Sequence, residues 1–280
     1  MESSPRPVAV LGASGRTGRL VVAAIAADPA LSLAAAVVGG ASSHLGLDAG
    51  ALCGVGVLGV PLTAVGPGCF GEAEVVIDFS LPHALASALP HLGARGLVSG
   101  TTGSSTPLLE QLEAHSLRAP VLCAANFSLG IELLKDLLAR AVVALPSADI
   151  EVIEAHHRHK RDAPSGTALA LAEVAARARG LDPQRALVHG RRGAVGPRPT
   201  DQIGLHALRG GDVTGAHTVW LLADGERIAL SHEASDRSTF ARGAVRAARW
   251  LLDRAPGRYL LADVLAPEPR TTSRGGSGGV

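Results

Sequence analysis

The first half of the chain alternates short apolar runs with stretches of helical periodicity. The apolar runs predict strands, and the stretches between them predict helices, two of which have proline near their start. The predicted strands are Val8–Leu11, Leu33–Val38, Val75–Phe79, Gly96–Ser99 and Val121–Ala124, and the predicted helices are Thr17–Ala27, Pro82–Leu92 and Pro107–Ser116. Apolar strands that alternate with helices are typical of a parallel sheet covered on both faces. The pattern therefore predicts a doubly wound α/β domain.

The second half has a different pattern. It predicts helices at Ile131–Leu145 and Thr167–Arg179 and strands at Asp149–Ala155, Ile203–Arg209, Val213–Leu222 and Arg227–His232. The turns Gly210-Gly211-Asp212 and Asp224-Gly225 have hairpin chemistry, so we expect consecutive hairpins in an antiparallel or mixed sheet.

A last predicted helix, Thr239–Asp253, can return to the first domain. We therefore expect a Rossmann-type domain over residues 1–128, completed by about 239–270, and a smaller α+β domain with a mixed sheet over 129–238. The Gly/Ser-rich tail, residues 271–280, is expected to be disordered.

Composition narrows the function classes. Hydrophobic residues make up 47% of the 280 residues and charged residues 18%, which is enough apolar material for a core. The formal net charge is +1, so no basic surface for nucleic acid or an anionic membrane is expected. No apolar run is long enough to span a membrane, and the polar start Met1–Pro5 does not resemble a secretory signal. Three cysteines without CxxC spacing predict neither disulfides nor zinc. We expect a cytoplasmic protein.

A glycine-rich turn, Gly12-Ala13-Ser14-Gly15-Arg16-Thr17-Gly18, joins the first strand to the first helix. Glycine there allows a tight turn and close approach to a pyrophosphate, which then faces the helix N-terminus. The spacing is GxxGxxG rather than GxGxxG, so a tight turn without a ligand is the alternative.

The second strand ends at Val38-Gly39 without the carboxylate that often binds the adenosine ribose. Its absence, with Arg16, Ser42 and Ser43 nearby, favours tolerance of NADP(H). The alternative is that backbone contacts alone hold the ribose and that selectivity is slight.

The densest chemistry lies in residues 154–167, which hold three histidines within four positions and one of the chain's two lysines. Zinc-binding patterns such as HExxH are absent, and adjacent histidines that follow a strand point in opposite directions, so no metal site is predicted. A solvated basic loop is the simplest alternative. Pro164-Ser165-Gly166-Thr167 precedes a helix and offers a hydroxyl cap and free N–H groups, which suit a small substrate with carboxylates.

The stretch from Glu154 to Ala168 closely resembles the signature of the 4-hydroxy-tetrahydrodipicolinate reductase family, also called dihydrodipicolinate reductase. Five further segments occur in the family's order and extend the resemblance over nearly the whole chain. They are Gly12–Gly18, Asp78-Phe79-Ser80, Gly100-Thr101-Thr102-Gly103, Ala124–Ser128 and Ser238-Thr239-Phe240.

The resemblance implies a role for each matching residue. His156 is expected to be the general acid/base and Lys160 the proton donor. The residues implied to bind substrate are His157, Ser165, Gly166, Thr167, Thr102 and Arg237. Those implied to bind the cofactor are Gly12, Ala13, Ser14, Gly15, Arg16 and Thr17 at the pyrophosphate, and Gly100, Thr101, Thr102, Ala124, Ala125, Asn126 and Phe127 at the nicotinamide.

The implied reaction is the NADPH- or NADH-dependent reduction of 4-hydroxy-tetrahydrodipicolinate to tetrahydrodipicolinate, with loss of water, in diaminopimelate and lysine synthesis. The family also implies a homotetramer formed through the second domain, and the apolar run Val219–Leu222 can either face a partner or lie under a helix. Two alternatives stay open: another two-domain NAD(P)-dependent amino- or imino-acid dehydrogenase, and a dinucleotide-sensing protein without catalysis. The family's acidic residue followed by arginine is missing at Val38-Gly39, which leaves the cofactor preference open.

Overall fold

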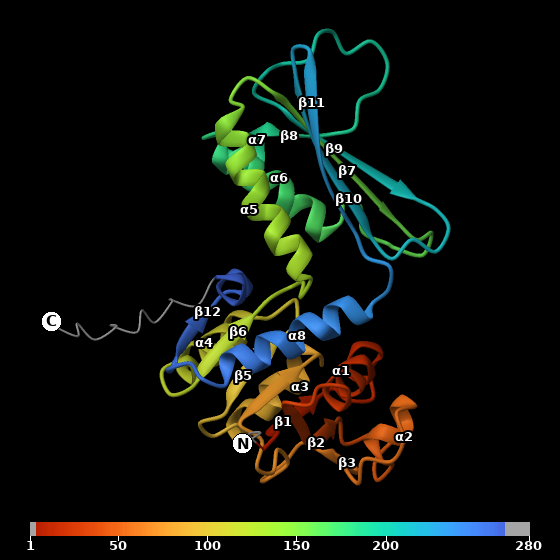
Figure 1. Cartoon of the computed structure of the whole chain (residues 1–280), viewed down its shortest axis with the longest axis vertical. Coiled ribbons are helices and arrows are strands. Elements are labelled where there is room, and N and C mark those ends of the chain that lie inside the picture. The colour runs from red at the N-terminus through yellow and green to blue at the C-terminus, as the bar shows by residue number, and fades with distance from the viewer. Residues whose placement is uncertain (1–3, 267–280) are drawn as a thin grey trace, which may run out of the picture.

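Two β-sheets, each with its own hydrophobic core, organise the chain (Figure 1). The structure is a computed structural model that describes residues 4–266. The first sheet has seven parallel strands in the order β12-β6-β5-β4-β1-β2-β3, and the second has five strands in the order β11-β10-β7-β9-β8. The predicted fold class, a Rossmann-type parallel sheet followed by a smaller mixed sheet, is confirmed.

The strands of the first sheet are β1 (Arg6–Leu11), β2 (Leu31–Val38), β3 (Leu62–Ala64), β4 (Val75–Asp78), β5 (Gly96–Ser99), β6 (Pro120–Cys123) and β12 (Gly257–Tyr259). The helical segments around it are α1 (Arg16–Ala26), α2 (Ala49–Cys53), α3 (Pro82–Ala88), η1 (Leu89–His91), α4 (Thr106–Ser116), α8 (Ser238–Leu251) and η2 (Leu261–Leu265). The five predicted strands are present. Periodicity did not predict α2, β3 and β12, because segments of three to five residues are too short to show a period.

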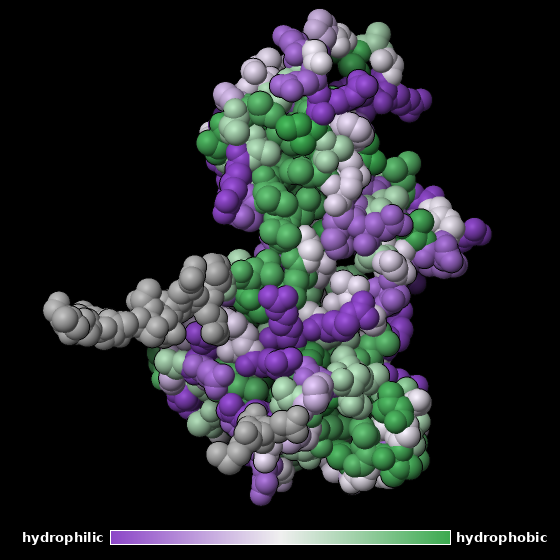
Figure 2. Space-filling view, in the orientation of Figure 1, coloured by the Kyte–Doolittle hydropathy of each residue, from purple (hydrophilic) through white to green (hydrophobic). Residues whose placement is uncertain are grey.

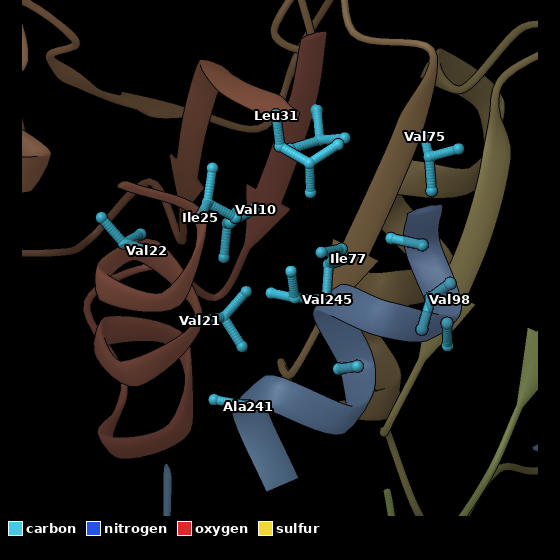
Figure 3. Close-up of a cluster of buried hydrophobic side chains, with 14 of the residues drawn as sticks. Val10, Val21, Val22, Ile25, Leu31, Val75, Ile77, Val98, Ala241 and Val245 are labelled. Atoms are coloured by element: carbon cyan, nitrogen blue, oxygen red, sulfur yellow. The ribbon is translucent and has the colours of Figure 1, made fainter. Parts of the chain in front are cut away.

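Both faces of the parallel sheet are covered by helices. Successive strand residues point to opposite faces, so Val10 packs with α1 and α8 whereas Leu11 packs with α3 and α4. Figure 3 shows the first of these cores, in which Val21 and Val245 meet over Ile77. Helix α8 therefore belongs to the core of the first sheet although more than 100 residues separate it in sequence from β6.

The second sheet is built around β7 (Asp149–His156). Strand β9 (Ile203–Arg209) lies parallel to it on one side, and β10 (Ala216–Ala223) lies antiparallel on the other. The edge strands are β8 (Leu187–His189) and β11 (Glu226–Glu233). Helices α5 (Leu129–Ala144) and α6 (Gly166–Ala178) pack on one face, and the short α7 (Pro183–Ala186) follows α6 (Figure 1).

One of the two predicted hairpins is wrong. The turn at Asp224-Gly225 does join β10 and β11, with Ala223 opposite Glu226. Residues 210–215 instead cross the end of β7, because β9 and β10 lie on opposite sides of that strand. The glycines at 210 and 211 favour a turn, but turn chemistry is local and does not determine which strand the chain pairs with next.

The apolar run on β10 is divided between the two faces of the second sheet. Val219 and Leu221 are fully buried under α5 and α6. Leu222 lies on the opposite face and is 37% exposed. Ile228 of β11 is paired with Leu221, so it lies on the helical face at the edge of the sheet, where it is 39% exposed. On the helical side, α5 also exposes Leu133, Leu137 and Val143. Figure 2 shows hydrophobic surface in the upper lobe, where Figure 1 places α5.

We expect the contact between α8 and the segment that follows β6 to tolerate no added side chain. A Cβ atom at Gly243 would lie 1.8 Å from the backbone oxygen of Phe127. Gly243→Ala should therefore lower the free energy of unfolding by at least about 1–3 kcal/mol, the usual cost of overpacking. Urea unfolding followed by circular dichroism measures this. The control is Gly210→Ala, where a Cβ would meet nothing within 4 Å; equal midpoints for the two variants would contradict the prediction.

Candidate active site

A cleft of about 670 Å³ lies between the two lobes. The loops that follow β5 and β6 form one wall, and the end of β7 with the start of α6 forms the other. Twelve of the residues predicted from the sequence line this cleft. They are Thr17, Gly100, Thr102, Ala124, Ala125, Asn126, Phe127, His156, Lys160, Ser165, Gly166 and Thr167.

A second opening, of about 780 Å³, lies beside the N-terminus of α1. Arg16, His157 and Arg237 line it, together with Arg158 and His159. The structure therefore does not bring His157 together with Ser165, Gly166 and Thr167. His156 and His157 end in different clefts, as expected for adjacent residues that leave a strand.

The glycine-rich turn is packed too closely for side chains at two of its positions. Gly12 has φ +81°, and a Cβ there would lie 2.7 Å from the oxygen of Phe79. A Cβ at Gly18 would lie 2.1 Å from the oxygen of Gly12. Helix α1 then begins without a side-chain cap at Gly15, so its first N–H groups are available to an anion. This arrangement fits the diphosphate of a dinucleotide.

A buried carboxylate organises the loops after β4 and β5. Asp78 is fully buried at the end of β4. It accepts hydrogen bonds from the Ser80 N–H (2.8 Å) and the hydroxyls of Ser80 (2.5 Å), Ser99 (2.6 Å) and Thr101 (2.8 Å). Thr101 therefore serves this network, while Gly100 and Thr102 line the cleft on either side of it.

Aromatic rings form an apolar part of the same wall. Phe79 and Phe127 meet edge to face with ring centroids 5.5 Å apart. A Cβ at Gly100 would lie 2.4 Å from the Phe79 ring, so only glycine permits this contact. Both phenylalanines line the cleft, which suits a flat, largely apolar ring such as nicotinamide.

A second buried carboxylate, Glu154, holds the opposite wall together. Its side chain is 0% exposed and accepts two hydrogen bonds from Arg209, both of 2.8 Å. It also accepts hydrogen bonds from His156 Nδ1 (2.6 Å) and from the Ser165 N–H (3.0 Å). Burial alone would raise the pKa of the Glu154 carboxyl, but these donors together hold that pKa below its usual range.

The carboxylate of Glu154 also determines how His156 is presented. Because Nδ1 donates to Glu154, Nε2 is the nitrogen left for proton exchange with a ligand. The imidazole is 11% exposed and lines the cleft. Glu154 and Arg209 were absent from the predicted site residues. Glu154 lies two residues before His156 at the end of a predicted strand, so the sequence could have placed both side chains on the same face. Arg209 comes from another strand, and no local sequence pattern links it to the site.

His217 packs against the other side of the His156 ring. The two ring centroids are 5.2 Å apart, and His217 Nε2 lies 3.2 Å from the Ser165 hydroxyl. Burial, followed by the charge of His156, lowers the pKa of His217 to about 4. His217 is therefore neutral in the folded protein near pH 7.

The N-terminus of α6 faces the cleft with its cap formed. The Ser165 hydroxyl accepts from the Ala168 N–H at 3.2 Å, as predicted for a helix cap. Across the cleft, Asn126 Nδ2 donates to the Thr167 hydroxyl at 3.0 Å. The two lobes therefore meet in a hydrogen bond beside the anion-binding end of the helix.

Both lysines of the chain line this cleft. Lys160 Nζ lies 2.8 and 2.9 Å from the Asp162 carboxylate oxygens, and Lys135 Nζ lies 2.7 Å from Glu132. Within residues 4–266 no group of three or more His, Cys, Asp or Glu side chains is placed to hold a metal ion. In the same range no helix is long and apolar enough to cross a membrane.

Comparison with known proteins identifies relatives of both parts of the chain. Residues 6–127 match the family described as Dihydrodipicolinate reductase, N-terminus, and residues 130–265 match Dihydrodipicolinate reductase, C-terminus. The 4-hydroxy-tetrahydrodipicolinate reductase of Pseudomonas fluorescens (strain Pf0-1) is 46% identical over 264 residues, which cover 93% of this chain and 98% of the relative. That of Rhizobium rhizogenes (strain K84) is 44% identical over 275 residues, covering 96% and 100%.

Among solved structures, the fold is similar to that of dipicolinate-bound dihydrodipicolinate reductase from Paenisporosarcina sp. TG-14. The TM-score is 0.68 at 20% sequence identity, and the match covers 91% of this chain and 97% of that one.

The buried imidazole of His217 should make stability depend on pH. In the unfolded chain its pKa returns to about 6.5. Between pH 6.5 and about 4 the unfolded state therefore binds a proton that the folded state does not, so stability falls as the pH falls, by up to about 1.4 kcal/mol per pH unit. His217→Gln should flatten this slope in urea unfolding measured at several pH values. The control, His83→Gln at an exposed position, should leave the slope unchanged; an unchanged slope in both variants would contradict the assignment.

Proposed function

The chain belongs to the dihydrodipicolinate reductase family, and from this premise we propose that the cleft lined by His156 and Lys160 is its active site. The protein is an NAD(P)H-dependent oxidoreductase of diaminopimelate and lysine biosynthesis. It reduces (2S,4S)-4-hydroxy-2,3,4,5-tetrahydrodipicolinate to (S)-2,3,4,5-tetrahydrodipicolinate with loss of water. The observation that carries this conclusion is the 44–47% identity to named reductases over more than nine tenths of the chain.

The cofactor site is proposed along the carboxyl ends of the parallel strands, where open α/β sheets bind ligands. Residues 12–17 are proposed to hold the diphosphate at the N-terminus of α1. Gly100, Thr102 and residues 124–127 are proposed to border the nicotinamide, next to the Phe79 ring. When bound, the reduced cofactor supplies a hydride to the substrate carbon. Thr101 is proposed to act indirectly, through its hydrogen bond to Asp78.

One substrate carboxylate is proposed to bind at the N-terminus of α6. Ser165, Gly166 and Thr167 offer hydroxyls and N–H groups at the positive end of the helix, and Thr102 faces them from the other lobe across the same cleft. His157 and Arg237 line the neighbouring opening. His157 and the start of α6 belong to the same lobe, so the proposed contact of His157 with the substrate requires the loop that follows β7 to rearrange.

Lys160 and His156 are proposed to exchange protons with the substrate. The 4-hydroxyl group leaves as water with a proton from the neighbouring carbon, which gives a C=C bond conjugated to the ring imine. Hydride addition to this conjugated system places negative charge on the substrate, and a lysine ammonium stabilises that charge and can then donate a proton to it. His156 supplies a second acid/base group whose ring is fixed by Glu154. Arginine could provide the positive charge at position 160 but could not give up the proton, because its pKa is too high.

We further propose the domain division and the assembly. The dinucleotide domain comprises residues 1–128 and about 239–270, and the substrate domain comprises 129–238. Support comes from the two core clusters, since α8 packs with the first sheet and α5 and α6 with the second; residues 271–280 lie outside the described range. The exposed sheet face with Leu222 and Leu208 supports a homotetramer formed through the second sheet. A biosynthetic role supports a cytoplasmic location.

The dehydrogenase and sensor alternatives are not favoured, because neither accounts for the signature from Glu154 to Thr167.

Proton donation by Lys160 can be tested by Lys160→Arg, which keeps the charge and should lower turnover by at least about 100-fold. The assay follows absorbance at 340 nm while a synthase generates the substrate from pyruvate and aspartate semialdehyde. His156→Gln should also lower turnover, with little change in NADPH affinity by isothermal titration calorimetry.

Arg161→Lys is the matched control for Lys160→Arg, since it makes the reverse change at the neighbouring exposed position, and it should retain turnover. Near-normal turnover of Lys160→Arg would show that the lysine serves only as an anion clamp. Tight cofactor binding by the wild type without any turnover would instead favour the sensor or another dehydrogenase.

The assembly can be tested by multi-angle light scattering. A homotetramer has four times the 28.4 kDa mass of the chain. Leu222→Asp, which places a charge on the exposed face of the second sheet, should shift the mass toward smaller species. Leu117→Asp is the control, because Leu117 is 80% exposed at the end of α4 in the first lobe. A monomeric wild type would refute the tetramer.

A further inference from the structure

The end of β2 offers no acceptor for a ribose hydroxyl. Gly39 and Gly40 follow the strand, and a Cβ atom at either position would meet nothing within 4 Å. Asp48 is the one acidic residue between β2 and β3. Its carboxylate accepts from the backbone N–H groups of Ala51, Leu58 and Val60 at 2.9–3.1 Å, so it is used by the start of α2 and the loop that follows.

A half-buried arginine lies next to this open corner. Arg19, on the first turns of α1, donates from Nε to the backbone oxygen of Ser14 at 2.9 Å. Its Nη2 atom lies 3.3 Å from His44 Nε2. Within residues 4–266 no carboxylate oxygen lies within 4.0 Å of the Arg19 guanidinium. The guanidinium groups of Arg191, Arg198 and Arg209, in contrast, each form an ion pair with a carboxylate. The arginine thus links the glycine-rich turn to the loop after β2 without being neutralised.

His44 completes the corner. Because Arg19 donates to Nε2, the proton of the neutral His44 ring is on Nδ1, which is therefore a donor. The loop is folded back on β2, since the Ser42 N–H donates to the Gly39 oxygen at 2.9 Å and the His44 N–H donates to the Ser42 hydroxyl at 3.2 Å. Arginine, imidazole and hydroxyl groups therefore gather beside the end of β2.

We propose that Arg19 and His44, with Ser42, bind the 2′-phosphate of NADPH and make NADPH the preferred cofactor. The proposal rests on the dinucleotide site proposed above. In Rossmann-type domains the adenosine ribose lies between the glycine-rich turn and the end of the second strand, and Arg19 joins these two segments. A free 2′-hydroxyl needs a carboxylate acceptor there, which is missing, whereas a phosphate needs a cation and N–H or O–H donors, which are present.

Fragment binding tests the proposal without turnover. Isothermal titration calorimetry compares adenosine 2′,5′-bisphosphate with 5′-AMP, which differ only in the 2′-phosphate. The wild type should bind the bisphosphate roughly 10- to 100-fold more tightly, the range expected for hydrogen bonds to a charged group. Equal affinities for the two fragments would overturn the proposal.

Three variants locate the site. Arg19→Met and His44→Leu should weaken bisphosphate binding and leave 5′-AMP binding within about threefold of wild type. Gly39→Asp introduces a carboxylate where there is room for it and should weaken bisphosphate binding by repulsion. Arg118→Met, on the far side of the same lobe at the end of α4, is the control for loss of a positive charge and should bind both fragments as wild type does. If Arg19→Met weakened both fragments equally, Arg19 would only support the turn through Ser14, and the proposal would fail.

Turnover separates this proposal from the proposed function. In Arg19→Met and His44→Leu, the ratio of kcat/KM for NADPH to kcat/KM for NADH in the coupled assay should fall by roughly 10- to 100-fold relative to wild type. If the wild type oxidised both cofactors equally well in the presence of substrate, the 2′-phosphate site would be refuted and the reductase function retained. If it oxidised neither while fragments bound as expected, the reductase function would be refuted instead.

Discussion

The burial of the Glu154 carboxylate is the constraint on which the substrate side of the cleft depends. A carboxylate removed from water is tolerated only when its oxygens are fully hydrogen-bonded. Here the donors come from the ends of β7 and β9 and from the start of α6. Arg209 reaches Glu154 because β9 pairs in parallel with β7, with Arg209 opposite His156. The hydrogen bonds that the Glu154 carboxylate requires therefore place the His156 imidazole next to the positive N-terminal end of α6.

The first lobe uses a related solution with different donors. Asp78 is also fully buried at the carboxyl end of a strand, but hydroxyl groups and one N–H satisfy it, without arginine. Its network includes Thr101 and thereby fixes the loop whose neighbouring residues line the cleft. Each wall is thus held by a buried carboxylate that does not itself line the cleft. Removal of either carboxylate would leave its donors unpaired and loosen the residues that face the ligand.

The sequence predicted those features whose signals are local. Apolar runs located β5 and β9 to the residue, and the Ser165 cap was evident from four adjacent residues. Pairing was not local: the glycines after β9 favoured a hairpin, whereas β9 and β10 flank β7. Arg209 and Glu154 are 55 residues apart, so no motif joined them. The side to which His157 points depends on where β7 ends, which periodicity fixes only to within a residue or two.

The two lysines show how composition and geometry combine. In a chain in which arginine supplies nearly all of the basic residues, Lys135 and Lys160 are separated by 25 positions and by strand β7, yet both line one cleft. Each is paired with a carboxylate on its own segment, Glu132 or Asp162. An ammonium is a compact charge that can rotate from such a carboxylate to a ligand, whereas a guanidinium is held by its planar fork. Lysine at both positions therefore keeps an ammonium group in the cleft. This group can leave its carboxylate partner and pair with an anionic substrate instead.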